Sequence, residues 1–151
     1  MLEWNMTASG MFSHANRFIE AYHTALQPLC RETGLPPMAV DILMYVANNP
    51  ESSTAGDICR CRGLKPGIVS VHVDRLVCEG LLERQSAQGD RRKVRLVCTP
   101  GAAGLVERGR ALQKAFGERL LEGVGEAELA AFRRCLAALE RNIDSIRRDG
   151  I

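Results

Sequence analysis

The chain has 151 residues, of which 46% are hydrophobic and 25% are charged, and its formal net charge is +2. This length and apolar content suffice for one buried core, so we expect a single domain over residues 1–151; the small net charge does not by itself indicate a nucleic-acid partner. The sequence lacks a run of about 18 apolar residues, and its N-terminus lacks the basic flank and apolar run of a signal peptide. We therefore expect a cytoplasmic protein with no membrane partner.

Two helices are predicted before residue 50. Between residues 11 and 31, apolar side chains recur at spacings of three and four, which places them on one stripe of a first helix. Gly34 and the prolines that follow it end this helix. The next helix, from Met38 to Asn48, is almost wholly apolar, so we expect it to be buried scaffold.

Two short helices separated by a tight turn follow. Thr54 and Asp57 match a capping box, in which the hydroxyl and the carboxylate satisfy free N–H groups at a helix start. Gly63 ends this helix, and Pro66 stands at the first position of the next one, where its missing N–H is harmless. That second helix continues to Glu79. This pairing is the signature of a helix-turn-helix.

A β-hairpin is predicted after the second short helix, because the hydrophobic period changes there. Val94, Leu96 and Cys98 alternate with residues of the opposite face, the period of two expected for a strand with one face on the core and the other toward phosphates. Gly89 and Asp90 supply turn chemistry between the two strands. The fold class is therefore mainly α with a small β-hairpin.

Two long helices are predicted at the C-terminal end, the first from Thr99 to about Leu121. The last helix carries apolar residues at alternating spacings of three and four, a near-heptad seam: Leu129, Phe132, Leu136, Leu139, Ile143 and Ile146. Acidic residues near its start and basic residues near its end match the helix dipole. Such a seam needs a partner, either the first helix of the same chain or a second copy, and we expect dimerisation through the first and last helices.

Positive charge is concentrated between Cys59 and Arg95. That stretch holds nine basic and four acidic residues, a local charge of +5, so the remainder of the chain sums to about −3. Such a concentration is expected where phosphates dock, although an ordinary solvated face is also charged.

Helix, helix, hairpin and long flanking helices in this order resemble the MarR (multiple antibiotic resistance regulator) family of bacterial transcription factors. The resemblance covers residues 11 to 147 and rests on these stretches: Ala55–Cys59, Val69–Leu76, Glu79–Arg84 and Asp90–Gly101. The last is the most specific, because the wing of this family carries an Asp-x-Arg turn followed by a strand that ends in a Leu-Thr-like pair and glycine. The resemblance implies a winged helix-turn-helix lobe at about 37–100 and dimerisation helices at about 11–33 and 101–148.

The wing turn and the second short helix are the predicted DNA-binding elements. Arg92 at the hairpin tip can enter a narrow minor groove while Asp90 holds its guanidinium, and the resemblance makes Arg75 an alternative or additional partner of Asp90. Ser70 can bond a base or a phosphate, and Val71 can contact a thymine methyl, although many family members carry a basic residue there. The predicted DNA-binding residues are Lys65, Pro66, Gly67, Ser70, Val71, Arg75, Asp90, Arg91, Arg92 and Lys93.

The six cysteines are scattered and favour core-filling roles. Cys59 and Cys61 point to different faces of one helix, and pairs at zinc-ligand spacing are absent from the sequence. Cys30 is the best candidate for a reactive thiol, since family analogy places the effector pocket near the end of the first helix. No nucleophile, base and orienting residue fall at a recognisable spacing. We therefore predict no metal, no cofactor and no enzymatic activity.

The resemblance implies a homodimeric repressor that binds a pseudo-palindromic operator in double-stranded DNA, with half-sites about 10 bp apart. A small aromatic or phenolic effector would release it. The candidate pocket residues are Phe12, Tyr22, Met44 and Phe116, although aromatic residues at helical spacing are usually core. Two alternatives remain: a thiol- or metal-responsive sensor on the same fold, and a winged-helix interaction module that does not bind DNA.

Overall fold

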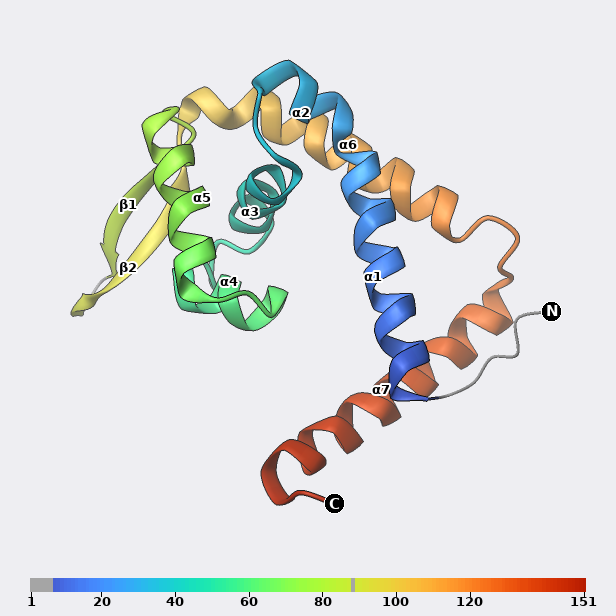
Figure 1. Cartoon of the computed structure of the whole chain (residues 1–151). Coiled ribbons are helices and arrows are strands. Elements are labelled where there is room, and N and C mark those ends of the chain that lie inside the picture. The colour runs from blue at the N-terminus through green and yellow to red at the C-terminus, as the bar shows by residue number, and fades with distance from the viewer. Residues whose placement is uncertain (1–6, 88) are drawn as a thin grey trace. The chain divides into compact units, whose positions relative to one another are not determined.

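The computed structural model describes residues 7–87 and 89–151. The chain divides into two compact units, of which the first ends at Phe116 and the second begins at Gly117. In the first unit, α3 lies at the centre, with α5 and the hairpin on one side and α1 on the other (Figure 1). Across the described residues, none of the helices combines the length and apolar character needed to cross a bilayer. The single domain expected from the sequence stays a prediction.

The N-terminal helix is broken, whereas one continuous helix was predicted. Helix α1 spans Ala8–Ala25 and α2 spans Gln27–Thr33, with Leu26 between them. Pro28 causes the break, because proline has no N–H for the helical ladder and its ring clashes with the carbonyl four residues earlier. Gly34, at φ 70°, ends α2 in the left-handed conformation that glycine adopts without strain.

Helix α3, Pro37–Asn48, forms the centre of the core. Every residue from 39 to 46 is buried, as predicted for this apolar segment. Asp41 is the charged member of this run, and its carboxylate is paired by Arg62 from the next helix. A buried carboxylate is tolerated only when it is paired and hydrogen-bonded, so this contact is required by the position of Asp41.

The helix-turn-helix consists of α4, Ala55–Arg62, and α5, Pro66–Cys78. The capping box that was predicted at the start of α4 is present, and Gly63 ends the helix at φ 63°. Helix α5 packs on α3 and α4 and buries these apolar side chains: Val69, Val73 and Leu76. The opposite face of α5 therefore points to solvent.

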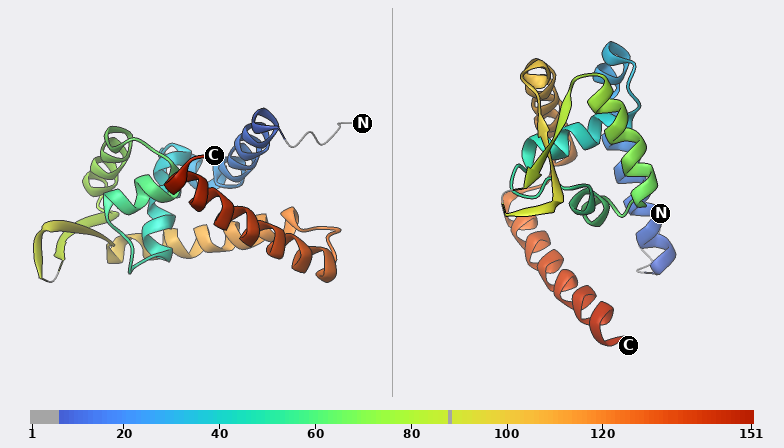
Figure 2. Two further views of the ribbon diagram at one scale, coloured as in Figure 1. Left: turned by 90° about the horizontal axis from the view of Figure 1, so that it is seen from below. Right: turned by 90° about the vertical axis from the view of Figure 1, so that its left-hand side faces the viewer.

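The hairpin pairs β1, Leu82–Ala87, with β2, Asp90–Cys98, in antiparallel register from Leu82 opposite Cys98. The loop before α4 joins this sheet, because Leu96 N donates to Ser53 O at 3.0 Å. Leu82 and Leu96 are buried at this root, but Val94 is exposed, so the prediction that Val94 faces the core is wrong. The outer part of the hairpin projects beyond the helices and has no core to face (Figure 2).

The C-terminal helices begin with η1, a 3-10 turn at Pro100–Ala102, which leads directly into α6, Ala103–Leu120. Helix α7 spans Glu126–Asp149, and Glu128 Oε2 accepts a hydrogen bond of 2.7 Å from Gly125 N at its start. None of the residues of α7 is buried, and Phe132 of the predicted seam is 60% exposed. On α7 the seam therefore forms an apolar face whose side chains from Phe132 to Ile146 are exposed.

Gly109 in α6 lies directly against Met44 of α3. A Cβ atom at position 109 would contact Met44 Sδ and lie 2.9 Å from Met44 Cε. Met44 is fully buried, and a close-packed core leaves its side chain no space to move into. Helix α6 therefore approaches α3 closely because position 109 has no side chain.

This close approach predicts the effect of Gly109→Ala. The matched control is Gly117→Ala in the same helix, where a Cβ atom meets nothing within 4 Å. Both substitutions gain the same helix propensity, so the difference between them reports overpacking, which costs about 1–3 kcal/mol. We expect Gly109→Ala to be less stable than Gly117→Ala by that amount in urea denaturation. Equal stabilities would show that the Met44 side chain can move and make room for the added Cβ atom.

Candidate nucleic-acid interface

The outward face of α5 and its N-cap carry the predicted DNA-binding residues of this segment. All six of them are exposed: Lys65, Pro66, Gly67, Ser70, Val71 and Arg75. Val71 has 67% of its surface exposed, the largest value for a large apolar residue of this helix. An apolar side chain so exposed gains nothing by packing within the chain, and it is placed to contact an apolar group on a partner.

Ile68 belongs to the same face and was missed by the sequence reasoning, which assigned it to the apolar stripe of the helix. Its side chain is 45% exposed. Residues three apart on a helix are neighbours, so Ile68 and Val71 form one small apolar patch. The spacing from Val71 could have identified it, since the inward face is already filled by Val69 and Val73.

The tip of the wing presents Asp90, Arg92 and Lys93 to solvent. Asp90 Oδ1 accepts a hydrogen bond of 2.9 Å from the backbone N–H of Arg92. Asp90 was predicted to bind the guanidinium of Arg92, but it binds the backbone N–H of Arg92 instead. The carboxylate therefore orders the backbone of the turn, and the guanidinium is free to extend. The side chain of Arg91, also predicted to bind DNA, lies outside the described part of the structure.

Arg75 has a different partner from the predicted one. Its Nη2 atom donates to the carbonyl oxygen of Gly34 at 2.8 Å. This bond connects the recognition helix α5 to the end of α2, so in this structure Arg75 fixes the position of α5 and is not held by Asp90 of the wing.

Four other cations of the basic stretch are held by partners within the protein. Arg62 Nε and Nη2 donate to the Asp41 carboxylate at 2.8 and 3.1 Å, and this bond raises the pKa of Arg62 above its ordinary value. The others are also paired: Arg60 with Asp57, Arg84 with Asp74, and Arg95 with the carbonyl of Pro50. These cations position the wing and α4 before any ligand is present.

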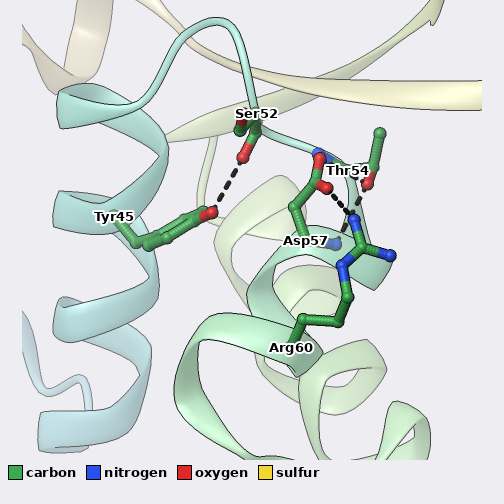
Figure 3. A network of polar contacts seen from close by, with 5 residues as sticks. All are labelled: Tyr45, Ser52, Thr54, Asp57 and Arg60. Atoms are coloured by element: carbon green, nitrogen blue, oxygen red, sulfur yellow. Dashed lines mark hydrogen bonds and ion pairs between the residues drawn. The ribbon is translucent and has the colours of Figure 1, made fainter. Parts of the chain in front are cut away.

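A capping network fixes the start of α4 beside the wing (Figure 3). Thr54 Oγ1 donates to Asp57 Oδ2 at 2.7 Å, and Asp57 also pairs with Arg60. These bonds, that of the Thr54 hydroxyl first, hold the pKa of Asp57 below its ordinary value. The carboxylate therefore stays ionised at neutral pH and caps the helix.

A groove of about 420 Å³ separates this helix start from the wing. Its lining includes three cations: Arg60, Arg92 and Lys93. Within the described residues, Lys65, Arg92 and Lys93 have neither an ion pair nor a side-chain hydrogen bond. Among the described cations between Cys59 and Arg95, these three are the ones open to neutralise phosphates: Lys65 stands at the N-cap of α5, and Arg92 and Lys93 stand on the wing.

A separate cavity of about 530 Å³ lies within the first unit, between α1, α3, the end of α4, and α6. Tyr22 and Phe116, two of the predicted pocket residues, line it, with ring centroids 5.4 Å apart in an edge-to-face arrangement. Phe18 packs edge to face on Phe116 from α1, at 5.6 Å. The wall on this side of the cavity is therefore aromatic.

Three other predicted residues are placed elsewhere. Phe12 is 72% exposed on α1 and is not part of the lining of this cavity, and Met44 is fully buried in the core against Gly109. Cys30 is buried, and this burial raises the pKa of its thiol. A raised pKa disfavours the reactive thiolate, so the structure does not support Cys30 as a reactive thiol. No cluster of three or more potential metal ligands occurs among the described residues.

The similarities to known proteins agree with this arrangement of helices and hairpin. Residues 33–93, from the end of α2 to the start of β2, match the model of the MarR family. The match covers about two fifths of the chain and confirms, over these residues, the resemblance to the MarR family that the capping, recognition-helix and wing segments predicted. None of the curated proteins matches this chain.

Solved structures with the same fold cover nearly all of this chain. MarR from E. coli in its apo form is 20% identical, with a TM-score of 0.63 over 89% of this chain and 96% of that one. The S. aureus MepR–DNA complex is 18% identical, with a TM-score of 0.74 over 95% and 99%. CouR from Rhodococcus jostii bound to p-coumaroyl-CoA is 22% identical, with a TM-score of 0.71 over 92% and 95%. These similarities confirm the winged helix-turn-helix fold.

Proposed function

We propose that this protein is a dimeric transcriptional repressor that binds a pseudo-palindromic DNA operator and is released by a small-molecule effector. The observation that carries the DNA-binding part is the arrangement of free cations. Lys65 precedes the exposed face of α5, and Arg92 and Lys93 stand on the wing, while Arg60, Arg62 and Arg84 are already paired. In this proposal α5 enters the major groove and the wing reaches the adjacent minor groove.

The apolar patch on α5 gives the proposed interface a preference for thymine. Ile68 and Val71 are exposed and lie one turn apart on the face that meets the base edges. The thymine methyl group is the apolar feature of the major groove. Ser70, between them in sequence, supplies a hydroxyl for a base or a phosphate.

A second copy of the chain is the proposed cover for the apolar faces of the terminal helices. On α7 the seam is exposed from Phe132 to Ile146, and on α1 these large apolar side chains are exposed: Met11, Phe12, Phe18 and Ile19. Contiguous apolar surfaces of this extent mark protein interfaces. A two-fold dimer would present two recognition helices to half-sites about 10 bp apart.

The cavity beside α1 and α6 is the proposed effector site. An aromatic wall that stands beside polar groups such as the Tyr22 hydroxyl and the Gln113 amide is typical of small-molecule sites, and CouR, a structural neighbour, was solved with p-coumaroyl-CoA bound. An effector bound here would touch α1 and α6 as well as α3 and α4. It changes operator affinity only if it binds one arrangement of these helices more tightly than another.

The test is selection of bound fragments from the source genome, followed by band-shift titration of the enriched duplex. We expect one enriched pseudo-palindrome and a complex that contains two chains, measured by sedimentation of the free protein and of the complex. A protein that enriches no sequence, or that remains a single subunit at micromolar concentration, would contradict the proposal.

A further inference from the structure

A chain of side-chain hydrogen bonds runs from the surface of α6 to the cavity. Arg110 Nε donates to Asn48 Oδ1 at 3.0 Å. Asn48 Nδ2 donates to Gln113 Oε1 at 2.9 Å. Gln113 Nε2 then donates to the hydroxyl oxygen of Tyr22 at 2.7 Å. The chain therefore ends on a residue that lines the cavity.

The direction of this chain is fixed by its first member. A guanidinium can only donate, so Asn48 must turn its oxygen toward Arg110 and its amide N–H groups toward Gln113. The same reasoning turns the amide N–H of Gln113 toward Tyr22. The Tyr22 oxygen is consequently an acceptor in this chain, and its own hydrogen is left for another acceptor.

No acceptor for that hydrogen is found among the described residues. The Asp41 carboxylate also lines the cavity, but its side-chain hydrogen bonds come from Arg62 Nε and Nη2 and not from Tyr22. Burial raises the pKa of Tyr22, and this outweighs the bond from Gln113. The hydroxyl therefore keeps its hydrogen at neutral pH, and Tyr22 is a lining residue of the cavity with a hydrogen to donate.

The charges of the cavity narrow the class of ligand further. Asp41 and Arg62 neutralise each other in a two-bond pair, which leaves His23 as the other lining side chain that can carry a positive charge. The aromatic side is formed by Phe18, Tyr22 and Phe116. A flat aromatic molecule with an uncharged acceptor oxygen satisfies both features.

We propose that Tyr22 is the specificity-determining donor of the effector cavity, and that it selects aromatic ligands whose carbonyl oxygen accepts its hydroxyl hydrogen. This inference rests on the effector site of the proposed function. The hydrogen-bond chain from Arg110 orients Tyr22, and Gln113 is the positioning residue that acts on it directly. The aromatic residues of the cavity contribute the same affinity whether or not the ligand carries a carbonyl oxygen.

The test compares two probes of equal shape, 2-acetylnaphthalene, which carries a carbonyl, and 2-isopropenylnaphthalene, which carries a CH₂ group in its place. Calorimetric titration of the full chain should give roughly two- to tenfold tighter binding of the acetyl compound, the net value of one hydrogen bond. Tyr22→Phe should abolish this ratio while retaining the ring, and Gln113→Leu should reduce it. Phe18→Leu is the matched control, expected to weaken both probes and keep the ratio.

The outcomes separate this inference from the proposed function. If wild type binds both probes equally, the effector cavity stands and the donor role of Tyr22 is wrong. If Tyr22→Phe retains the wild-type ratio, the donor is another group. If neither probe binds wild type, the effector cavity itself is wrong and the inference falls with it.

Discussion

Replacing Arg92 by alanine is expected to lower operator affinity roughly tenfold or more, the range found when an arginine that inserts into DNA is removed. Arg92 stands at the wing tip, exposed and without an ion pair among the described residues, and Asp90 fixes its backbone. Both wings of a dimer lose the contact at once. Band-shift titration of the selected operator fragment measures the loss.

The control for net charge is Arg119→Ala, which removes one cation from the second unit. Arg119 is exposed and pairs with Glu122. We expect it to leave operator affinity nearly unchanged, and we expect both variants to melt like wild type because neither side chain is buried. If Arg92→Ala bound the operator as wild type does, the wing would have no part in recognition.

Substitution of Arg62 by methionine is expected to destabilise the fold by about 3 kcal/mol, as removal of one partner of a buried ion pair does. The side chain of Asp41 is only 4% exposed, so its carboxylate would be left buried without a counter-ion. Arg62 also lies 5.2 Å from the ring centre of Tyr45, a contact that the variant loses. Urea denaturation measures the change in the free energy of unfolding.

Two controls identify the cause of that loss. The double substitution Asp41→Leu with Arg62→Met removes both charges and should recover most of the stability, because well-packed apolar residues often replace a buried pair without loss. Arg108→Ala breaks an exposed pair with Glu32 and should cost less than about 1 kcal/mol. If the double variant were as unstable as Arg62→Met, the unpaired carboxylate would not be the cause.

Local signals predicted the elements of the lobe well. The capping box at Thr54, the stop at Gly63 and the start at Pro66 are short-range features, and the structure contains all three. Each depends on backbone groups within a few residues, which the sequence displays directly. Pro28 was an equally local signal for the break between α1 and α2, and it was overlooked in favour of the longer apolar stripe.

The roles of the cations could not be read in the same way. Their partners are distant in sequence: Arg62 binds Asp41, and Arg75 binds the carbonyl of Gly34. A count of charges treats all nine basic residues alike, whereas the fold separates those that hold the lobe together from those that face solvent. Only the packing of α3 against α4 and α5 makes this distinction.

Of the four predicted cavity residues, Tyr22 and Phe116 line the cavity, whereas Phe12 and Met44 do not. An aromatic or methionine side chain at helical spacing fits a core, a cavity wall or a free surface equally well. Met44 lies in the core because Gly109 of α6 allows close approach, and Phe12 is exposed because it lies six residues, more than one and a half helical turns, before Phe18, where α1 begins to border the cavity. The hydrogen-bond chain from Arg110 to Tyr22 joins three helices and has no sequence signature.

The salt dependence of binding to duplex DNA tests most directly the claim that this lobe binds the phosphate backbone. Neutralisation of roughly six to ten phosphates by a dimer predicts a loss of about 10³- to 10⁵-fold in affinity between 50 and 200 mM salt. A smaller slope is expected for Arg92→Ala. An affinity that does not change over this range would contradict the account and would identify the lobe as a winged-helix interaction module that does not bind DNA.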